Sequence, residues 1–532
     1  MATKTKTAVP TSFLIFFVLC GALVIFGFAL AAYFMARPGH DQTSYFLEAE
    51  RMLAGVELYG PHLSETNPPT IIWFSALPVL LARWMHGSPM FFLRLLVMVL
   101  IAGSVAWCVR ILRRDTLINK PFGLGLVTLA VVVSEFCIGP YNFCQREHLL
   151  VILILPYLLA GATGAAGRFS FAERWALGAV AGIAVWFKPQ DVLVVLGLEL
   201  FLALRSRSLR RILSPEFLGC VATGALVLVL IRLVTPLYWT VTVPLLFETY
   251  WALGTMNTLA LALHLHYYQA EVVVAVVLFL LVRRSLRDPW TFIGLLVCSI
   301  AAFLAFAVQH NDWWYHAYPH EALYLLAVAY LLVDLLNPFF QRLLSDQQSL
   351  RRTAFATSGC VAAVLCIIAL HPQALVARAT HSTRYALDEY LAQYEPSTTV
   401  SSLSTRVEPM AFVFNHSLNW GSRFAHLWML PAIIQNELGP NSPSVPFKRL
   451  PAETVERLAA LQRRESAEDL NYWRPAVVVV EQCNVEHPCI GLEGKEFDML
   501  SWFLRGPEFA AQWSYYQRET EVDNFVVYRR VQ

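Results

Sequence analysis

Residues 283–316 read RRSLRDPWTFIGLLVCSIAAFLAFAVQHNDWWYH, and this stretch contains the organisation that recurs along most of the chain. Its centre, 289–308, has no charged side chain and is long enough for a helix to cross the hydrocarbon core of a bilayer. Arginines precede the run, whereas histidines, an acid and aromatic residues follow it. The pattern predicts a membrane-spanning helix with one basic end and one chemically richer end.

Similar apolar runs recur over the first 371 residues and predict about eleven membrane spans. Lys188-Pro189 separates two of the shorter runs and must break the helix there. The first run is longer than the core of a signal peptide, so we expect an uncleaved anchor. The apolar stretch 68–85 is shorter, and we expect it to form an interfacial helix. The predicted spans are 11–35, 91–110, 121–138, 148–166, 173–187, 190–204, 216–235, 268–282, 289–308, 318–336 and 353–371.

The composition agrees with a membrane protein and excludes other classes. Hydrophobic residues make up 57% of the chain and charged residues 15%, which a disordered chain does not show. A net charge of +2, from 40 basic and 38 acidic residues, provides no field for nucleic acid. Most of the ten cysteines lie in apolar runs, where cysteine behaves as a small hydrophobe. Cys483 and Cys489 bracket a short loop, and the sequence leaves open whether they pair.

The loops give an orientation and a second domain. Basic residues gather in alternate loops, such as 205–211 and 283–287, which places the amino terminus in the cytoplasm. An odd number of spans then places the segment 372–532 outside the plasma or inner membrane. This segment is charged and Pro-rich, and it contains expected strands at 475–481 and 525–530 and an expected helix at 452–465. We therefore predict a polytopic α-helical membrane module, 1–371, followed by an extracytoplasmic α/β domain.

Polar and ionisable residues gather at the outer ends of the spans, in five loops of which the first is 37–90. Such groups near a membrane are costly unless they pair or line a functional cavity. Five clusters above one bundle predict an outward-facing cleft with acids for proton transfer and cations for an anionic ligand. The clusters are His40, Asp41, Glu48, Glu50, Glu57, His62 and Glu65; Gln145 to His148; Lys188, Gln190 and Asp191; Glu248, His264, His266, Gln269 and Glu271; and His310 to His316 with His320 and Glu321.

Each cluster also has a structural interpretation. Trp313 and Trp314 suit an interfacial aromatic belt, and Glu48 and Glu50 suit the solvated face of a helix over 43–54. Asp41 is equally placed to cap that helix. Arg146-Glu147 suits a local ion pair. Three tryptophans of the predicted outer domain are of a type that stacks on sugar rings, but core packing is the expected role of all three: Trp420, Trp428 and Trp473.

The first outer loop resembles the corresponding loop of GT-C glycosyltransferases, in the branch of the protein mannosyltransferase-like and aminoarabinose-transferase-like enzymes. That branch has an acid after the first span, an amphipathic helix, a Gly-x-x-x-Tyr segment and a Pro-Pro stretch leading to an arginine. Asn67 stands where lysine is common in the family. The residues that carry the resemblance are His40-Asp41, Tyr45 to Ala49, Leu53 to Gly55, Leu58-Tyr59, Glu65 to Pro69, Trp73, Arg94, Arg146 to His148 and Lys188-Pro189.

The resemblance implies transfer of a sugar from a polyprenyl-phosphate donor to an acceptor hydroxyl of a glycan, lipid or protein outside the membrane. A weakly nucleophilic hydroxyl needs a general base, for which Asp41 is the first candidate and Glu147 the second. The departing phosphate needs cations, and Arg146, Lys188, His310 and His316 are the candidates. Some relatives use a divalent cation, and Mg²⁺ or Mn²⁺ would draw its ligands from Asp41, Glu147 and His148. Further contacts with substrate are expected from Tyr59, Glu65, His148 and His320.

Other classes of function remain alternatives. A multi-span transporter would place ionisable residues near the bilayer midplane and show internal repeats, which the sequence lacks. A non-catalytic scaffold would use the outer domain to bind glycan and the spans as an anchor. An O-antigen polymerase or ligase would carry its key residues in a large late outer loop, whereas here the acids lie in the first.

Overall fold

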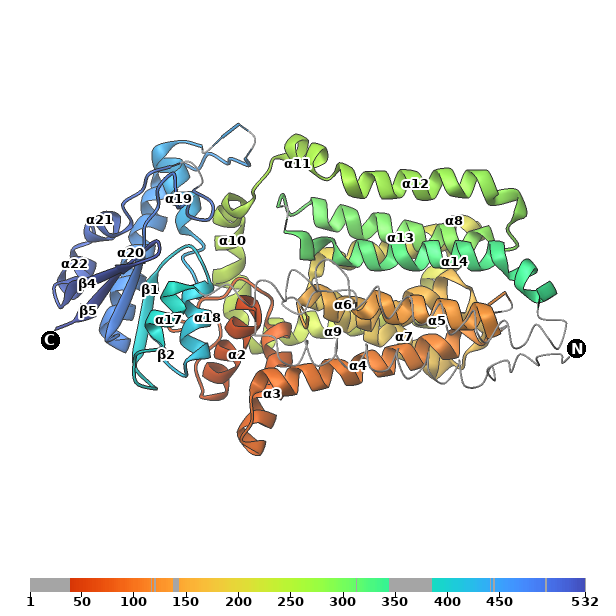
Figure 1. The fold of residues 1–532 in the computed structure, drawn as a ribbon, viewed down its shortest axis with the longest axis horizontal. Helices are drawn as coiled ribbons and strands as arrows, with labels where there is room; N and C mark the ends of the chain where they lie inside the picture. The colour runs from red at the N-terminus through yellow and green to blue at the C-terminus, as the bar shows by residue number, and fades with distance from the viewer. Residues whose placement is uncertain are drawn as a thin grey trace, which may run out of the picture.

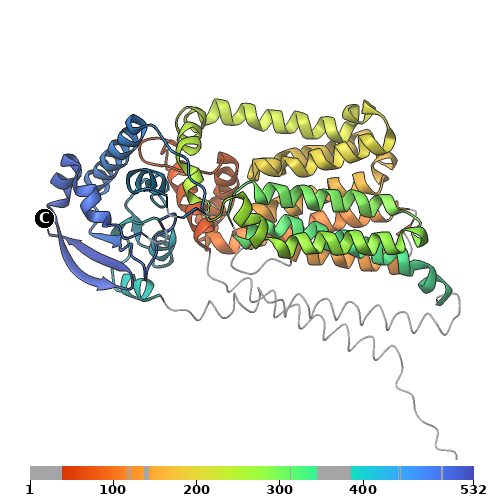
Figure 2. The same cartoon turned by 90° about the horizontal axis from the view of Figure 1, so that it is seen from above.

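The computed structural model describes residues 39–115, 117–118, 121–136, 143–311, 313–343, 385–440, 442–443, 445–492 and 495–531. Figure 1 shows a bundle of long helices with the carboxyl-terminal domain at one of its ends. From above, the long helices still lie alongside one another and the domain still adjoins one end (Figure 2). The predicted spans 11–35 and 353–371 lie outside the described residues.

Each predicted span inside the described ranges is occupied by a helix. Lys188 and Pro189 interrupt the chain between α7 and α8, as predicted. Within the described ranges, five helical segments are long and apolar enough to cross a membrane: α4, α9, α13, the segment 266–285 containing α12, and the segment 315–336 overlapping α14. The helices are α4 (Pro89–Leu112), α5 (Pro121–Phe136), α6 (Arg146–Ala162), α7 (Phe171–Ala184), α8 (Val192–Ser206), α9 (Pro215–Val234), α12 (His266–Val282), α13 (Pro289–Ala307) and α14 (Tyr318–Leu343).

Small residues allow close packing inside the bundle. A Cβ atom at Gly178 of α7 would overlap the carbonyl oxygen of Glu216 at the start of α9. Helix pairs in membranes commonly use glycine in this way, because its absence of a side chain lets two backbones meet. Apolar side chains such as Leu233 of α9 and Leu281 of α12 are instead largely exposed, as expected for a surface that faces lipid.

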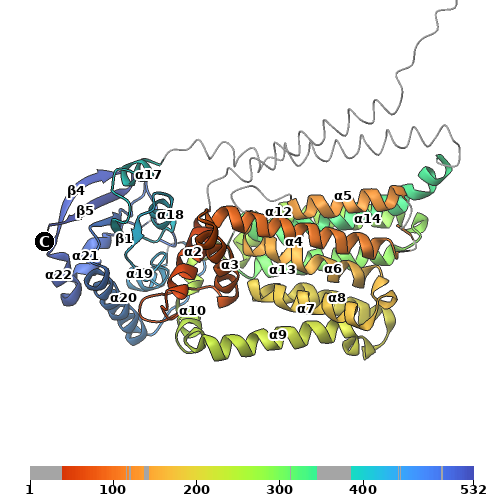
Figure 3. The same ribbon diagram turned by 90° about the horizontal axis from the view of Figure 1, so that it is seen from below.

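The segment 39–90, which belongs to the predicted first outer loop, forms two helices, α2 (His40–Leu53) and α3 (Pro69–Met85). They lie at the end of the bundle nearest the carboxyl-terminal domain (Figure 3). One face of α3 is buried, while Trp84 is 78% exposed, which suits the interfacial helix expected at 68–85. The prediction that Glu48 faces solvent is wrong, because its side chain is buried. Helix α2 packs against α3 and also against α18 (Glu408–Asn415) of the carboxyl-terminal domain, so it has no fully solvated face.

The carboxyl-terminal domain is built on a five-stranded sheet of order β2-β1-β3-β5-β4. Strand β1 pairs in parallel with β2 and β3, whereas β5 pairs antiparallel with β3 and β4. The expected strands and helix are present as β3, β5 and α20. The elements are β1 (Thr399–Leu403), β2 (Asn419–Trp420), β3 (Val477–Glu481), β4 (Tyr516–Val522), β5 (Phe525–Arg530), α17 (Ala386–Leu391), α18, α19 (Leu430–Leu438), α20 (Ala452–Trp473), α21 (Met499–Leu504) and α22 (Pro507–Trp513).

Backbone and side-chain bonds join this domain to the first outer loop. Ser64 donates its backbone N–H to the carbonyl of Arg423. The guanidinium of Arg51 in α2 donates to the carbonyls of Trp420, at 2.6 Å, and Ser422, at 2.7 Å. These bonds fix the segment 420–428 against α2 and the loop 64–67.

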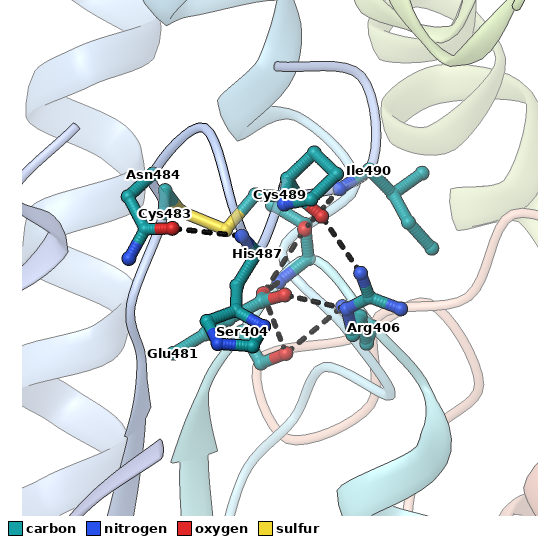
Figure 4. The surroundings of a disulfide bond; sticks show 10 residues. Ser404, Arg406, Glu481, Cys483, Asn484, His487, Cys489 and Ile490 are labelled. Atoms are coloured by element: carbon teal, nitrogen blue, oxygen red, sulfur yellow. Dashed lines mark hydrogen bonds and ion pairs between the residues drawn. A yellow bond between two sulfur atoms is a disulfide. The ribbon is translucent and has the colours of Figure 1, made fainter. Parts of the chain in front are cut away.

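Cys483 and Cys489 form a disulfide, which decides the alternative that the sequence left open (Figure 4). The buried carboxylate of Glu481 lies beside it and accepts hydrogen bonds from Ser404, at 2.9 Å, and from Nε of Arg406, at 2.7 Å. Arg406 also donates to the carbonyl of Pro488 in the disulfide loop. The bridge and these bonds together hold the loop against the end of β3.

Candidate functional site

Asp41 lies in the first turn of α2, where the side chain of Gln145 reaches it from the start of α6. Nε2 of Gln145 donates to Oδ2 of Asp41 at 2.9 Å, and Nε2 of His40 lies 3.3 Å from Oδ1. Burial raises the pKa of Asp41, but the charges of His40 and Arg146 and the Gln145 bond outweigh it and lower the pKa below its ordinary value. The carboxylate is therefore ionised at neutral pH. It is not the N-cap of α2, which is Gly39.

Glu147 lies at the centre of a buried charged cluster. Lys188 donates to its Oε1, and Nε2 of His316 lies 3.3 Å from the same oxygen. All three side chains are at most 4% exposed. The expected local pair of Arg146 with Glu147 is thus replaced by a pair between α6 and the Lys188-Pro189 turn. Nδ1 of His316 lies 3.0 Å from Oδ1 of Asn311, which fixes the ring.

Arg146, the first residue of α6, donates to the side-chain oxygen of Asn67. Asn67 is held in place by its own loop, because the carboxylate of Glu65 accepts from its backbone N–H and its Nδ2, both at 2.6 Å. The hydroxyl of Tyr59 donates to the Asn67 carbonyl at 2.6 Å. In the structure Glu65 and Tyr59, which we expected to contact substrate, shape the turn that presents Asn67 to Arg146.

A cavity of about 500 Å³ joins the four predicted phosphate-binding residues: Arg146, Lys188, His310 and His316 all line it. Much of the remaining lining is apolar, and an apolar wall comes from α10 (Val243–Thr249) and the turn 250–253 that follows it. Helix α10 lies between the bundle and the carboxyl-terminal domain (Figure 1). We call this space the donor cavity; its remaining lining residues are Thr66, Asn67, Pro68, Pro189, Gln190, Tyr238, Val243, Leu246, Phe247, Tyr250, Trp251, Val308, Gln309 and Pro446.

A second, much smaller cavity of about 30 Å³ lies on the other side of Thr66 and Asn67, which line both spaces. Asp41 lines the small cavity and not the large one. We call it the Asp41 chamber. The carboxyl-terminal domain contributes four of its residues, and the full lining is Asp41, Ser44, Tyr45, Ser64, Glu65, Thr66, Asn67, Val407, Ala425, His426 and Trp428.

His148 and His320, two further predicted substrate contacts, line neither space. Nδ1 of His148 accepts from the backbone of Cys144, and its Nε2 lies 2.6 Å from the Glu135 carbonyl. His320 is buried among the bundle helices beside Ser299. The structure therefore gives both histidines packing partners instead of a place at either cavity.

Asp41, Glu147 and His148, the expected ligands of a divalent cation, do not surround a common metal position. His148 uses its ring nitrogens on backbone groups, while Glu147 holds Lys188. Among the described residues, the group with suitable ligand spacing is Glu481 with Cys483 and Cys489. Those two thiols are joined to each other, so they are no longer thiolate ligands.

Two parts of the site were not predicted from sequence. The apolar wall of the donor cavity comes from 243–251, a short stretch between the predicted spans 216–235 and 268–282. His426 and Trp428 come from the carboxyl-terminal domain, hundreds of residues from Asp41. No motif marks His426, and the sequence favours core packing for Trp428. The pairing of the segment 422–424 with Ser64 and the bonds from Arg51 to Trp420 and Ser422 place them beside α2.

The fold can be compared with solved structures. ArnT from Cupriavidus metallidurans bound to undecaprenyl phosphate matches with a TM-score of 0.54 and 13% identity, over 98% of each chain. The apo state of the same protein matches with a TM-score of 0.52 and 14% identity, again over 98% of each chain. Comparison with protein-family models gives no match, and neither does comparison with curated protein sequences. The chain thus shares the fold of ArnT, which confirms the expected resemblance at the level of the fold. Its long apolar helices support an integral membrane protein.

Proposed function

We propose that this chain, which shares the fold of a GT-C glycosyltransferase, transfers a sugar from a polyprenyl-phosphate donor to an acceptor hydroxyl. The observation that carries the proposal is the donor cavity, where four basic or ionisable side chains face an apolar wall. A polyprenyl phosphate has the matching chemistry, an anionic head on an apolar chain. The ArnT structure with undecaprenyl phosphate bound supports the same class of donor.

Arg146 is the side chain best placed to hold the phosphate. Its Nε has no hydrogen-bond partner among the described residues, although the atom is buried. A guanidinium stays protonated in proteins and binds phosphate oxygens through paired N–H groups. Lys188 is held by Glu147, which also contacts His316, so the ammonium group stands at a fixed position in the cavity lining. Preorganised charge of this kind stabilises a phosphate as it leaves.

The apolar wall has the composition expected for contact with a prenyl chain. Leu246, Tyr250 and Trp251 line it, and Phe247 is 75% exposed at its edge. Burial of apolar surface contributes roughly 25 cal/mol per Å², so a chain lying along this wall adds affinity that the phosphate alone does not have.

In the proposed reaction Asp41 accepts the proton of the acceptor hydroxyl. The acceptor oxygen forms a bond to the anomeric carbon while the bond from that carbon to the phosphate oxygen breaks. One displacement without a covalent intermediate inverts the anomeric carbon, and polyprenyl phosphate leaves. Glu147 is the second candidate base, but its Oε1 is already committed to Lys188.

We place the site on the outer face of the membrane, with the amino terminus in the cytoplasm. Two observations support this orientation. The basic loops predict it, and the Cys483–Cys489 disulfide suits the oxidising exterior. A lipid-linked donor also removes any need for a cytosolic nucleotide sugar.

The donor half of the proposal is tested by binding of undecaprenyl phosphate to the purified chain in nanodiscs. We expect Arg146→Gln to weaken binding at least tenfold, because it removes the charge with the free Nε. Arg113→Gln, an exposed arginine distant from the cavity, is the matched control and should bind like the parent. Equal binding by both variants would remove Arg146 from the donor site.

The catalytic half is tested with a panel of polyprenyl-phosphate sugars and membrane-extracted acceptors. We expect Asp41→Asn to bind undecaprenyl phosphate normally but to release polyprenyl phosphate from donor at least a hundredfold more slowly than the parent. Glu57→Gln, an exposed acid of the same loop, should keep full activity. If Asp41→Asn stays active and Glu147→Gln does not, the base is Glu147. A parent inactive across the whole panel would contradict the transferase proposal.

A further inference from the structure

The Asp41 chamber has two unequal sides. The membrane module supplies Asp41, Ser44 and Tyr45 from α2 and the loop 64–67, and the carboxyl-terminal domain closes the space with His426 and Trp428. The chamber is therefore complete only where the two parts of the chain meet.

Three of the residues that line the chamber each carry a buried polar atom with no hydrogen-bond partner among the described residues. These atoms are the hydroxyl oxygen of Tyr45, Nδ1 of His426 and Nε1 of Trp428. Buried polar atoms in folded proteins are nearly always paired, since an unmade bond costs free energy. Three such atoms around one cavity indicate that a polar group from outside the chain completes their bonds.

The chemistry of the lining restricts that group. An indole N–H only donates, so the group must accept a hydrogen bond, and a carboxylate only accepts, so it must also donate one. A hydroxyl does both. The carboxylates of Asp41 and Glu65 in the same lining disfavour a phosphate or carboxylate, whereas the cations lie in the donor cavity beyond Asn67.

The size of the chamber restricts it further. A space of about 30 Å³ holds one or two water-sized groups, because a single water occupies roughly 10–15 Å³ by the same kind of measure. A sugar ring does not fit, but a hydroxymethyl arm does. The segment 422–424 that borders the chamber is already bonded to Ser64, so it offers no free backbone edge to an extended peptide. A glycan is the better match.

We propose that the Asp41 chamber is the acceptor site, and that His426 and Trp428 select the primary hydroxyl of a sugar hydroxymethyl group. This proposal rests on the proposed function and adds the acceptor to it. Nε1 of Trp428 donates a hydrogen bond to the acceptor oxygen, and Asp41 takes the proton of that hydroxyl. The donor sugar meets the acceptor oxygen beside Asn67, which lines both cavities. The new bond forms from the hydroxymethyl oxygen to the anomeric carbon, and the phosphate leaves on the donor side.

The kinetic test compares two probes that differ by one group: methyl glucoside, which has a hydroxymethyl arm, and methyl xyloside, which lacks it. We expect the parent to transfer sugar to the first at least tenfold faster than to the second and to inorganic phosphate. Trp428→Phe keeps the ring but removes the N–H, and it should raise the KM for methyl glucoside about tenfold with little change in kcat. Its affinity for undecaprenyl phosphate should not change. Trp473→Phe, in the same domain but outside both cavities, is the control.

A second measurement needs no donor. In protein labelled with 5-fluorotryptophan, the ¹⁹F resonance assigned through Trp428→Phe should shift in a saturable way with methyl glucoside and not with methyl xyloside. Equal responses to both glycosides, or an unchanged KM in Trp428→Phe and His426→Leu, would overturn the proposal. A response to N-acetylserinamide alone would make the acceptor a protein and contradict the glycan assignment. Failure of the parent to bind undecaprenyl phosphate is a different result, which contradicts the proposed function instead.

Discussion

Nε2 of Gln145 donates a hydrogen bond of 2.9 Å to Oδ2 of Asp41, joining the start of α6 to the first turn of α2. The next residue after Gln145 is Arg146. Two consecutive residues therefore hold Asp41, the proposed base, and supply the proposed phosphate-binding cation. This relationship gives the two cavities a constant geometry and leads to a first prediction.

Gln145→Leu should move the acid limb of the activity profile to higher pH. Burial raises the pKa of Asp41, and His40, Arg146 and Gln145 together lower it below its ordinary value. Removal of the Gln145 bond leaves burial less opposed, so the pKa rises and Asp41 loses its proton only at higher pH. We expect the acid limb of kcat, measured as polyprenyl phosphate release, to lie at higher pH than in the parent. Gln512→Leu, in α22, should leave the profile unchanged.

Lys188→Met should destabilise the protein more than the double variant Lys188→Met/Glu147→Gln. Removal of one member of a buried ion pair leaves the other charge unpaired, which costs about 3–5 kcal/mol, whereas removal of both charges costs less. Thermal unfolding of each variant in the same detergent measures the difference. A single variant as stable as the parent would show that Glu147 does not need Lys188.

Stability should fall as pH rises from about 4 to 6, in part because of Asp469. Burial raises the pKa of Asp469 to about 6 from the ordinary 3.8, although Arg423 opposes the shift. In that window the folded protein holds more protons than the unfolded chain, so the free energy of unfolding decreases with pH. Asp469→Asn should reduce this slope, and Glu508→Gln, an exposed acid, should not. Thermal midpoints measured from pH 4 to 7 decide the prediction; an unchanged slope in Asp469→Asn would contradict it.

Replacement of Cys483 and Cys489 by serine should destabilise the carboxyl-terminal domain by about 2 kcal/mol, as expected for a bridge that closes a loop this short. The bonds of Arg406 to Glu481 and Pro488 remain, so we expect local loosening of 484–488 instead of unfolding. Hydrogen exchange on that loop, compared with β3, measures the effect. Equal acceleration in β3 would mean that the bridge supports the whole domain.

The bundle was predictable from sequence because a long uncharged run has few stable outcomes other than a buried or membrane-spanning helix. The run 289–308 and helix α13 coincide almost residue for residue. The burial of Glu48 was not predictable, because helical periodicity gave α2 a polar face without showing that Glu65 of the following loop would lie close to it. The four candidate phosphate-binding residues line one cavity. The pairing of Glu147 with Lys188 was not predictable, because it depends on how the Lys188-Pro189 turn packs. His426 and Trp428 reach the chamber only through tertiary contacts, which leave no local pattern.

The pairing of Ser64 with the segment 422–424 also affects the biogenesis of the protein. Asp41 emerges from the ribosome early and His426 late, yet both line one chamber. A partly synthesised chain can assemble most of the donor cavity while the Asp41 chamber is still open to water. Folding of the carboxyl-terminal domain is therefore the step that closes the Asp41 chamber, and only after it do both cavities exist in one molecule.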